Sequence, residues 1–502
     1  MGKLRFAYAG SYHSTSRTMN AIIFSLQRAL LLLGMALIGT AAFRAPAAEA
    51  PKPNIIFILA DDLGWGDLGC YGHPHIDSPN LDRLAKQGTL FTQFYVNASV
   101  CSPSRCAFMT SHYPARHAIH GHYATHEQNR KRGMSNWLDS KVPNVASVLK
   151  TAGYATAHFG KWHLGGGVGA PEPGAYGIDD YRVVVGNGPT WDLPPAELWP
   201  KSSALIVDEA IRFIKANQAR PFFLNVWMLL PHATLNPTDE QMRPYARFAV
   251  ANGVPHKSAA QIYYASVTDL DAQVGRLLDE LDKLVLADQT LVLFSSDNGP
   301  ENIHIRNAGH SGIGSAGPFR GRKRSLYEGG VRMPFIARWP GHVPANRVDD
   351  TSVVAAVDFL PTLCGFAGIT LPAETKPDGE DVSDILCGQA RPRATPLFWE
   401  WRFGIVGEPF HRSPILAIRE GDWKLLLNPD RSRLELYDIP RDPTQLSNTA
   451  KDHPEIVERL ANKALAWQAT LPKGPVEASA GKADYPWPGR GGKPKPAGRA
   501  AK

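Results

Sequence analysis

The sequence predicts an α/β protein with a large, mixed but mostly parallel sheet sandwiched by helices, and a smaller C-terminal α+β domain with an antiparallel sheet. Two observations carry this prediction. Up to Pro392, short and continuously apolar runs alternate with stretches of helical periodicity, which is typical of parallel strands buried between two layers of helices. Beyond Pro392, strand-like runs follow one another with only turns between them, which favours an antiparallel sheet.

The elements of the large domain, expected at residues 51–392, follow from these patterns in chain order. Apolar, β-rich runs predict strands at residues 54–60, 154–159, 222–229 and 290–296. Apolar residues at helical spacing predict helices at residues 80–87, 145–152, 204–217 and 262–284, the last being the longest. Polar residues come directly after several of the strands. Because sites in open α/β sheets lie at the carboxyl ends of strands, we expect one shared site there.

The smaller domain is expected at residues 393–472. It contains four predicted strands and a closing helix, at residues 396–401, 415–419, 423–427, 435–438 and within 447–468. Residues 473–502 are rich in Pro, Gly, Lys and Ala, and this composition predicts a disordered basic tail.

Residues 1–50 have the pattern of a signal peptide. Arg28 precedes the apolar run 29–43, and small residues follow up to the A-E-A tripeptide at 48–50, after which we expect cleavage. Met19 is an alternative start of the chain. An uncleaved membrane anchor is the alternative interpretation, although the run is shorter than the ~20 residues of a membrane span. We therefore expect a secreted or periplasmic protein that has no membrane association once the leader is removed.

The formal net charge of +7 is concentrated at the two ends of the chain. Residues 1–50 contain five basic residues and one acidic residue, and residues 473–502 contain seven basic and two acidic residues. The part between them is close to neutral, so the charge gives no indication of nucleic-acid binding.

The number of cysteines is odd, which leaves one of them for a separate role in an exported protein. The five are Cys70, Cys101, Cys106, Cys364 and Cys387. If Cys101 is set aside, the other four allow three sets of disulfides. A disulfide between Cys364 and Cys387 is one possibility, and buried free thiols are the alternative.

The segment from Cys101 to Arg105 predicts the first turn of a helix. Ser102 and Pro103 suit the N-cap and the first turn. Arg105 lies four residues after Cys101, so both side chains would face the same way at a helix end whose N–H groups attract an anion. Taken alone, this pattern would favour a structural thiol.

With its surroundings, however, this segment resembles the type I sulfatase family of the alkaline phosphatase superfamily. The family signature C-x-P-x-R reads C-S-P-S-R here. The resemblance also covers NIIFILADDLGWGDLGCYG, GYATAHFGKWHLG, PHATL, FSSDNG and FRGRKRSLYEGGVRMPFIARWPG, and it spans residues 53 to about 465 in the order of the family. The early blocks carry a further likeness to arylsulfatases and N-acetylgalactosamine-6-sulfatases.

The resemblance implies that a formylglycine-generating enzyme oxidises Cys101 to formylglycine before folding. It also implies one calcium ion in the large, catalytic domain, with the ligands Asp61, Asp62, Asp297, Asn298 and residue 101. Hard oxygen donors of this kind suit Ca²⁺ or Mg²⁺ rather than zinc. The alternative interpretation of the acidic dipeptides is that they are turn residues at strand ends.

The resemblance further implies a covalent mechanism on the hydrated aldehyde. One hydroxyl takes the sulfuryl group, and loss of the proton of the other expels sulfate without attack by water. Arg105 is expected to position the hydrate, and Lys161 and Lys323 to bind sulfate oxygens. His163 would take the hydrate proton, and His232, with Lys323, would protonate the leaving alcohol. Without the family resemblance, Lys161 and His163 could instead belong to a surface strand. His232 could be a turn residue, and Lys323 could belong to a solvated basic run.

The sequence departs from the family pattern in two places. Arg322 and Arg324 flank Lys323, where small residues are usual, and they would meet an anionic substrate or only solvent. Histidines also cluster after the predicted nucleophile, at His112, His117, His120, His122 and His126. This cluster suggests either a second metal site or a pocket rim that contacts the substrate.

Three functions remain open from the sequence. The first is hydrolysis of sulfate esters on a sulfated small molecule or glycan, and the second is hydrolysis of phosphonate or phosphate esters. The third is binding of a sulfated glycan without turnover, if Cys101 stays a thiol. We expect substrate specificity to reside in the loops at residues 165–193, 304–315 and 400–411.

Overall fold

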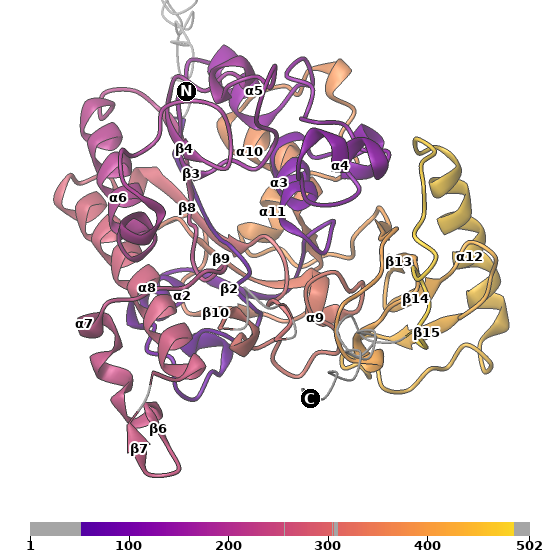
Figure 1. Cartoon of the computed structure of the whole chain (residues 1–502). Coiled ribbons are helices and arrows are strands. Elements are labelled where there is room, and N and C mark those ends of the chain that lie inside the picture. The colour runs from indigo at the N-terminus through magenta and orange to yellow at the C-terminus, as the bar shows by residue number, and fades with distance from the viewer. Residues whose placement is uncertain (1–51, 256, 304, 306–309, 486–502) are drawn as a thin grey trace, which may run out of the picture. The chain divides into compact units, whose positions relative to one another are not determined.

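The computed structural model describes residues 52–255, 257–303, 305 and 310–485, so the expected leader lies outside the described residues (Figure 1). Its main feature is a nine-stranded sheet with the order β10-β2-β9-β8-β1-β5-β3-β4, in which β11 also pairs with β2. The strands are β1 (Asn54–Ala60), β2 (Thr89–Tyr95), β3 (Ala155–Lys161), β4 (Asp180–Val184), β5 (Phe222–Trp227), β8 (Thr290–Ser296), β9 (Arg332–Arg338), β10 (Arg347–Asp349) and β11 (Val354–Ala355). Only β9 runs antiparallel to its neighbours in this sheet, which confirms the predicted mixed, mostly parallel architecture.

Helices cover both faces of this sheet because its central strands are apolar on both faces. Ile55, Phe57 and Leu59 of β1 point into one core, and Ile56 and Ile58 point into the other. The first core is closed by α3 (Cys101–Thr110), α5 (Val145–Thr151), α10 (Phe359–Ala367) and α11 (Ser383–Leu386). The second is closed by α2 (Pro79–Lys86), α6 (Pro195–Ala216), α7 (Asp239–Met242) and α8 (Ala259–Lys283).

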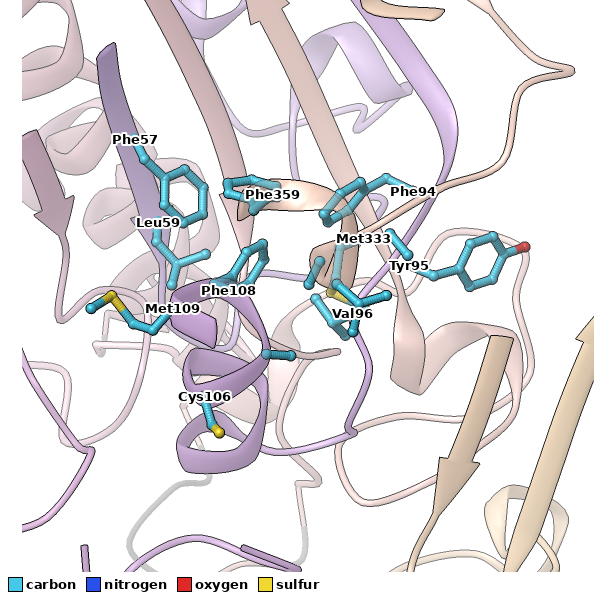
Figure 2. Packing of buried hydrophobic residues seen from close by; sticks show 14 of the residues in the cluster. Phe57, Leu59, Phe94, Tyr95, Val96, Cys106, Phe108, Met109, Met333 and Phe359 are labelled. Carbon is cyan, nitrogen blue, oxygen red and sulfur yellow. The ribbon is translucent and has the colours of Figure 1, made fainter. Parts of the chain in front are cut away.

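The first core anchors the helix that begins at Cys101. Figure 2 shows Phe57 and Leu59 of β1 packed against Phe108 of α3 and Phe359 of α10. The ring centroids of Phe57 and Phe108 are 4.9 Å apart, and those of Phe57 and Phe359 are 4.6 Å apart. Because all four side chains are buried, α3 is held on the sheet by packing along its length.

The smaller sheet consists of β12 (Leu397–Glu400), β13 (Leu416–Glu420), β14 (Trp423–Leu427) and β15 (Glu435–Asp438), antiparallel in chain order. Leu425 faces α12 (Pro454–Ala469), whereas Trp399 and Leu426 belong to the first core of the large sheet. The predicted antiparallel sheet is therefore confirmed. One face of this smaller sheet packs against α12, and the other face packs into the first core of the large sheet.

Several elements were not predicted, and β2 shows why. Its sequence TLFTQFY places polar residues among aromatic ones, so it lacks a continuous apolar run. Gln93 is nevertheless buried, because it donates to the carbonyl of Asp350 and accepts from Arg419. The short elements α4 (His126–Lys131), α9 (Glu328–Val331), β6 (Val250–Ala251) and β7 (Val254–Pro255) were also missed.

The C-terminal segment differs from the prediction of disorder after residue 472. The hydroxyl of Tyr485 donates to the carbonyl of Ile405 and accepts from its N–H group, each at 2.7 Å. The guanidinium of Arg412 lies 3.8 Å from the ring centroid of Tyr485 and donates to the carbonyl of Ala483. Glu477, Ala483 and Tyr485 therefore contact the folded chain although residues 473–478 are exposed, and the rest of the predicted tail lies outside the described residues.

All five cysteines lie in the described residues, and all are free thiols. The suggested disulfide between Cys364 and Cys387 is therefore not formed. The alternative of buried free thiols holds for Cys106 and Cys364, whereas Cys70 is half-buried and Cys387 is exposed. Among the residues that the structure describes, no helix is both long enough and apolar enough to cross a membrane.

A buried ion pair joins the smaller sheet to the large domain. Lys424 of β14 donates to Glu328 of α9 over 2.8 Å, and both side chains are fully buried. Burial alone would raise the pKa of Glu328, but Lys424, Arg332 and Arg419 outweigh burial and lower it to about 2. Arg419 also contacts the hydroxyl of Tyr95.

Replacing Lys424 with methionine should strongly destabilise the protein, because it leaves the charge of Glu328 buried with less compensation. The free energy of unfolding, measured by urea denaturation, should fall by about 3–5 kcal/mol. The exposed Lys451→Met variant is the matched control. A decrease in the free energy of unfolding of less than about 1 kcal/mol, which is the contribution of a surface ion pair, would show that the contact between Lys424 and Glu328 does not hold the smaller sheet on the large domain.

Candidate active site

Four buried polar side chains meet where two central strands end. Asp61 and Asp62 follow β1, and Asp297 and Asn298 follow β8, whose last residue pairs in register with the last residue of β1. Asp62 adopts a left-handed conformation with φ 66°, which turns the chain sharply at this point. Its N–H group donates to Asp297 over 3.1 Å, so the two strand ends are bonded to each other. Neighbouring parallel strands thus bring the Asp61-Asp62 and Asp297-Asn298 dipeptides together.

The oxygens of this cluster fit a divalent cation. Among the described residues, Oδ1 of Asp61 and Oδ1 of Asn298 are buried and have no hydrogen-bond partner. Burial and the adjacent charge of Asp61 raise the pKa of Asp297 to about 6, although Arg105 opposes this shift. An unpaired buried acceptor costs about 1–3 kcal/mol, and a hard cation bound by these oxygens would remove that cost.

The ligand atoms of Asp61, Asp62 and His232 all lie within 4.8 Å of one another. His232 is thus close enough to share the candidate metal site, although we predicted it as a proton donor. Its Nε2 lies 3.8 Å from Oδ2 of Asp62, and its Nδ1 lies 2.6 Å from the carbonyl oxygen of Ala233.

The guanidinium of Arg105 is fully buried beside this cluster. It donates to Oδ2 of Asp297 over 2.7 and 3.0 Å and to the carbonyl of Lys161 over 3.0 Å. It also lies 3.6 Å from Oδ1 of Asp61 and 5.0 Å from the ring centroid of Trp227. Arg105 therefore braces the acidic cluster and the end of β3 from the first turns of α3.

Two buried lysines, Lys161 and Lys323, lie beside the acidic cluster in addition to Arg105. Nζ of Lys161 lies 2.5 Å from Oδ2 of Asp61, and Nζ of Lys323 lies 2.7 Å from both carboxylate oxygens of Asp62. Lys323 also lies 3.5 Å from Glu301. Each lysine is thus aimed at the acidic cluster by a different carboxylate, which holds its ammonium group at the strand ends.

Cys101 is the first residue of α3 and is 2% exposed. Burial raises the pKa of its thiol, although Lys161 and Lys323 lie close enough to oppose this shift. An unmodified Cys101 is therefore protonated at neutral pH and a poor nucleophile. The N–H of Tyr123 donates to Oγ of Ser102 over 3.0 Å, which ties the loop after α3 to the residue beside Cys101.

His163 reaches the same place from the end of β3. It has a left-handed conformation with φ 53°, and its Nε2 lies 3.3 Å from the carbonyl oxygen of Tyr123. Its Nδ1 is buried and has no partner among the described residues. Burial, Lys161 and Arg105 lower the pKa of His163 well below its ordinary value, so the ring is neutral and can accept a proton.

The structure brings all of the predicted site residues to one edge of the sheet. They are Asp61, Asp62, Cys101, Arg105, Lys161, His163, His232, Asp297, Asn298 and Lys323. Their individual roles stay predictions.

The two arginines that flank Lys323 have partners within the protein. Arg322 donates to the backbone carbonyls of Glu301, Gly312 and Gly314 and thereby holds a loop. Arg324 forms a two-pronged contact with the carboxylate of Glu301, at 2.5 and 3.1 Å. Neither arginine therefore faces only solvent, and contact of either one with an anionic substrate stays a prediction.

Most of the loop histidines are engaged elsewhere. His112 contacts His117 at 3.1 Å, His120 contacts Glu400 at 3.3 Å, and His126 contacts the carbonyl oxygen of Gly166 at 2.9 Å. Within the described residues, Asp61, Asp62 and His232 form the only group of three or more His, Cys, Asp or Glu side chains whose ligand atoms lie close enough together to hold a metal. The suggested second metal site is therefore not formed there, and His122 remains as the candidate rim residue.

Glu301 was not predicted from the sequence as a site residue, because its position three residues after Asn298 is not itself a recognisable motif. It is 3% exposed, and it lies between the ammonium of Lys323 and the guanidinium of Arg324. Its Oε1 also accepts from the N–H of Asn302 over 2.7 Å. A buried carboxylate that contacts a cation of the site is expected to fix where that cation points.

Comparison with known proteins identifies the family of this chain. The family model described as Sulfatase matches residues 53–369, and the model described as N-sulphoglucosamine sulphohydrolase, C-terminal, matches residues 317–469. The chain belongs to the sulfatase family, within the alkaline phosphatase superfamily, and it is an arylsulfatase-like hydrolase of sulfate esters.

Particular relatives refine this placement. The chain is 34% identical to arylsulfatase A of Homo sapiens, over 76% of this chain and 76% of the relative. It is 29% identical to N-acetylgalactosamine-6-O-sulfatase of Bacteroides thetaiotaomicron, over 82% and 92% of the two chains. The crystal structure of Ps i-CgsB in complex with k-i-k-neocarrahexaose superimposes with a TM-score of 0.70 at 27% identity, covering 85% and 96% of the two chains.

Replacing Glu301 with glutamine should impair turnover, because Lys323 and Arg324 lose a shared carboxylate and Lys323 is no longer held between two acids. We expect kcat/KM for an aryl sulfate to fall roughly ten- to hundredfold, the size expected when a site group is misplaced by about 1 Å. The matched control is Glu374→Gln at an exposed position. Steady-state kinetics within roughly twofold of the unsubstituted enzyme would rule out a positioning role for Glu301.

Proposed function

We propose that this protein is an exported, calcium-dependent sulfatase that releases sulfate from a sulfated carbohydrate, with a nucleophile made from Cys101. The observation that carries the proposal is the placement of Cys101 at the start of α3, near the charges of Lys161, Lys323, Asp61 and Asp297. A covalent nucleophile, sulfate-binding cations and metal ligands thus share one buried site.

The environment of Cys101 supports modification of this residue. Since its thiol is buried and protonated, it is unsuited to attack sulfur as it stands. We propose that a formylglycine-generating enzyme oxidises it to the aldehyde. The hydrate of that aldehyde supplies one hydroxyl that takes the sulfuryl group and a second whose deprotonation releases sulfate, before water restores the hydrate.

The other residues have roles that follow from their positions. Lys161 and Lys323 bind the sulfate oxygens, whose negative charge they stabilise as the ester bond breaks. The partnerless Nδ1 of His163 takes the proton of the second hydroxyl, since this ring is neutral. His232 is one-third exposed, but burial lowers its pKa to about 4 and its Nδ1 faces the carbonyl oxygen of Ala233, so the neutral ring carries no proton on Nε2. His232 must therefore first take up a proton, which the negative charge of a bound sulfate ester favours, before it protonates the leaving alcohol together with Lys323.

Calcium is the ion that the donor set favours. Asp61, Asp62, Asp297 and Asn298 offer only hard oxygens, among them two buried oxygens without a hydrogen-bond partner. Such an ion, when bound, lowers the pKa of the hydrate and clamps sulfate oxygens. Arg105 holds Asp297 toward this position from α3.

Two further observations support the substrate class and the location. Relatives of this chain are named for action on N-acetylgalactosamine-6-O-sulfate or are described with a bound neocarrahexaose, and we extend a carbohydrate substrate to this protein. Export to the periplasm or the outside of the cell rests on the signal-peptide pattern of residues 1–50.

Mass spectrometry of the purified protein tests this proposal. The peptide that contains residue 101 should be lighter by about 18 Da, because sulfur and two hydrogens are lost and one oxygen is gained. Cys101→Ala should release no sulfate from aryl or sugar sulfates, whereas Cys387→Ala, at an exposed position, should keep full activity.

Two results would refute the proposal. One is an active enzyme in which residue 101 is an unmodified thiol. The other is fully modified, calcium-loaded protein that leaves aryl sulfates and a panel of sulfated sugars intact.

A further inference from the structure

A short loop at residues 311–315 lies between the turn that carries His232 and the segment that carries Lys323. The hydroxyl of Ser311 donates to the carbonyl of Pro231, which directly precedes His232, over 2.7 Å. Ser311 is completely buried, and so is this hydrogen bond. Loss of the hydroxyl would leave the buried carbonyl without this partner, so the bond favours one position of the turn.

The same loop is held from the other side by the residue that precedes Lys323. Nη2 of Arg322 donates to the carbonyls of Gly312 and Gly314, over 2.8 and 2.7 Å. The loop is therefore bonded to the residue before His232 at one end and to the residue before Lys323 at the other. It acts as a brace between the two segments that carry these side chains.

A buried carboxylate fixes the far end of the loop. Asp67 accepts from the N–H groups of Ser315 and Gly64, each over 2.7 Å, and from the hydroxyl of Tyr263 in α8 over 2.6 Å. A Cβ atom at Gly314 would lie 2.6 Å from the hydroxyl of Tyr263, so the loop packs closely on α8. The brace is thus attached to the body of the large domain and cannot shift freely.

His232 and Lys323 face one carboxylate from the two segments that the loop connects. Nε2 of His232 lies 3.8 Å from Oδ2 of Asp62, and Nζ of Lys323 lies 2.7 Å from the same oxygen. Nδ1 of His232 lies 2.6 Å from the carbonyl oxygen of Ala233, the next residue of its own turn. The imidazole therefore moves with its turn, and the turn is held by Ser311.

We propose that Ser311 is a positioning residue for protonation of the leaving alcohol. Through residues 311–315, it sets the distance between His232 and Lys323. The proposal rests on the proposed function, because it assumes that these two groups act on the leaving alcohol. When the bond between sulfur and the ester oxygen breaks, the sulfuryl group passes to residue 101, and the ester oxygen takes the proton that His232 has gained. Displacement of the turn by about 1 Å slows this proton transfer.

The dependence of the rate on the leaving group tests this role. Protonation contributes little for para-nitrophenyl sulfate, whose phenolate leaves readily, and more for para-methoxyphenyl sulfate, whose phenol is a weaker acid. Ser311→Ala should lower kcat/KM about tenfold or more for the methoxy compound, and by no more than about threefold for the nitro compound. Ser311→Cys nearly keeps the size of the side chain but donates weakly, so it should show the same selective loss without leaving a cavity.

A double-mutant cycle separates positioning from a merely structural effect. In a His232→Ala background, Ser311→Ala should change kcat/KM for the methoxy compound by less than about twofold, because the group that it positions is absent. Ser202→Ala in α6 is the matched control. Ser202 is 1% exposed and donates to the carbonyl of Trp199 over 2.8 Å, and its replacement should leave the rates on both compounds unchanged.

Three results would overturn the role of Ser311: equal losses on the two aryl sulfates, no loss on either, or the same loss in the His232→Ala background. Release of sulfate from sugars by the unsubstituted enzyme reports the proposed function separately. Failure to cleave any sulfated sugar would refute that function while the aryl sulfates still test the brace. An enzyme that is inactive on the aryl sulfates as well would overturn both.

Discussion

The site depends on one constraint, the burial of three carboxylates at the ends of two adjacent parallel strands. Asp61, Asp62 and Asp297 cannot all stay ionised in this place without compensation, because buried like charges repel and lose their hydration. The structure meets this demand with Arg105, Lys161 and Lys323, which come from three different elements and each contact at least one of the acids. The acids thereby decide where the cations of the site point, and two oxygens remain for an ion.

The large sheet supplies the acids, but the remaining parts of the chain hold the other groups. Packing of α3 through Phe108 sets the position of Cys101 and Arg105. The segment that carries Lys323 leads into α9, where Glu328 is bonded to Lys424 of the smaller sheet. The smaller sheet thus contacts, through Lys424, the helix that follows the segment carrying Lys323.

Much of this arrangement could be predicted from the sequence, because β1 and β8 are mainly apolar runs that are followed directly by Asp61-Asp62 and Asp297-Asn298. Alternation and family motifs were enough to predict that the candidate metal ligands and the cations lie at one edge of a parallel sheet. The partners of Arg322 and Arg324 could not be predicted, since Glu301 and the loop carbonyls are brought to them only by tertiary folding. The same holds for residues 473–485, whose Pro- and Gly-rich composition indicates disorder, although Tyr485 and Glu477 anchor them.

The most direct measurement of the central claim is calorimetric titration of metal-stripped protein with Ca²⁺. The account predicts a single site with a dissociation constant on the order of micromolar or lower, and a rise in the unfolding temperature when the ion binds. Asp297→Asn should abolish both effects, and the exposed Asp288→Asn variant should retain them. Absence of binding heat and of stabilisation in the unsubstituted protein would show that the cations of the chain alone balance the buried carboxylates, and it would contradict the account.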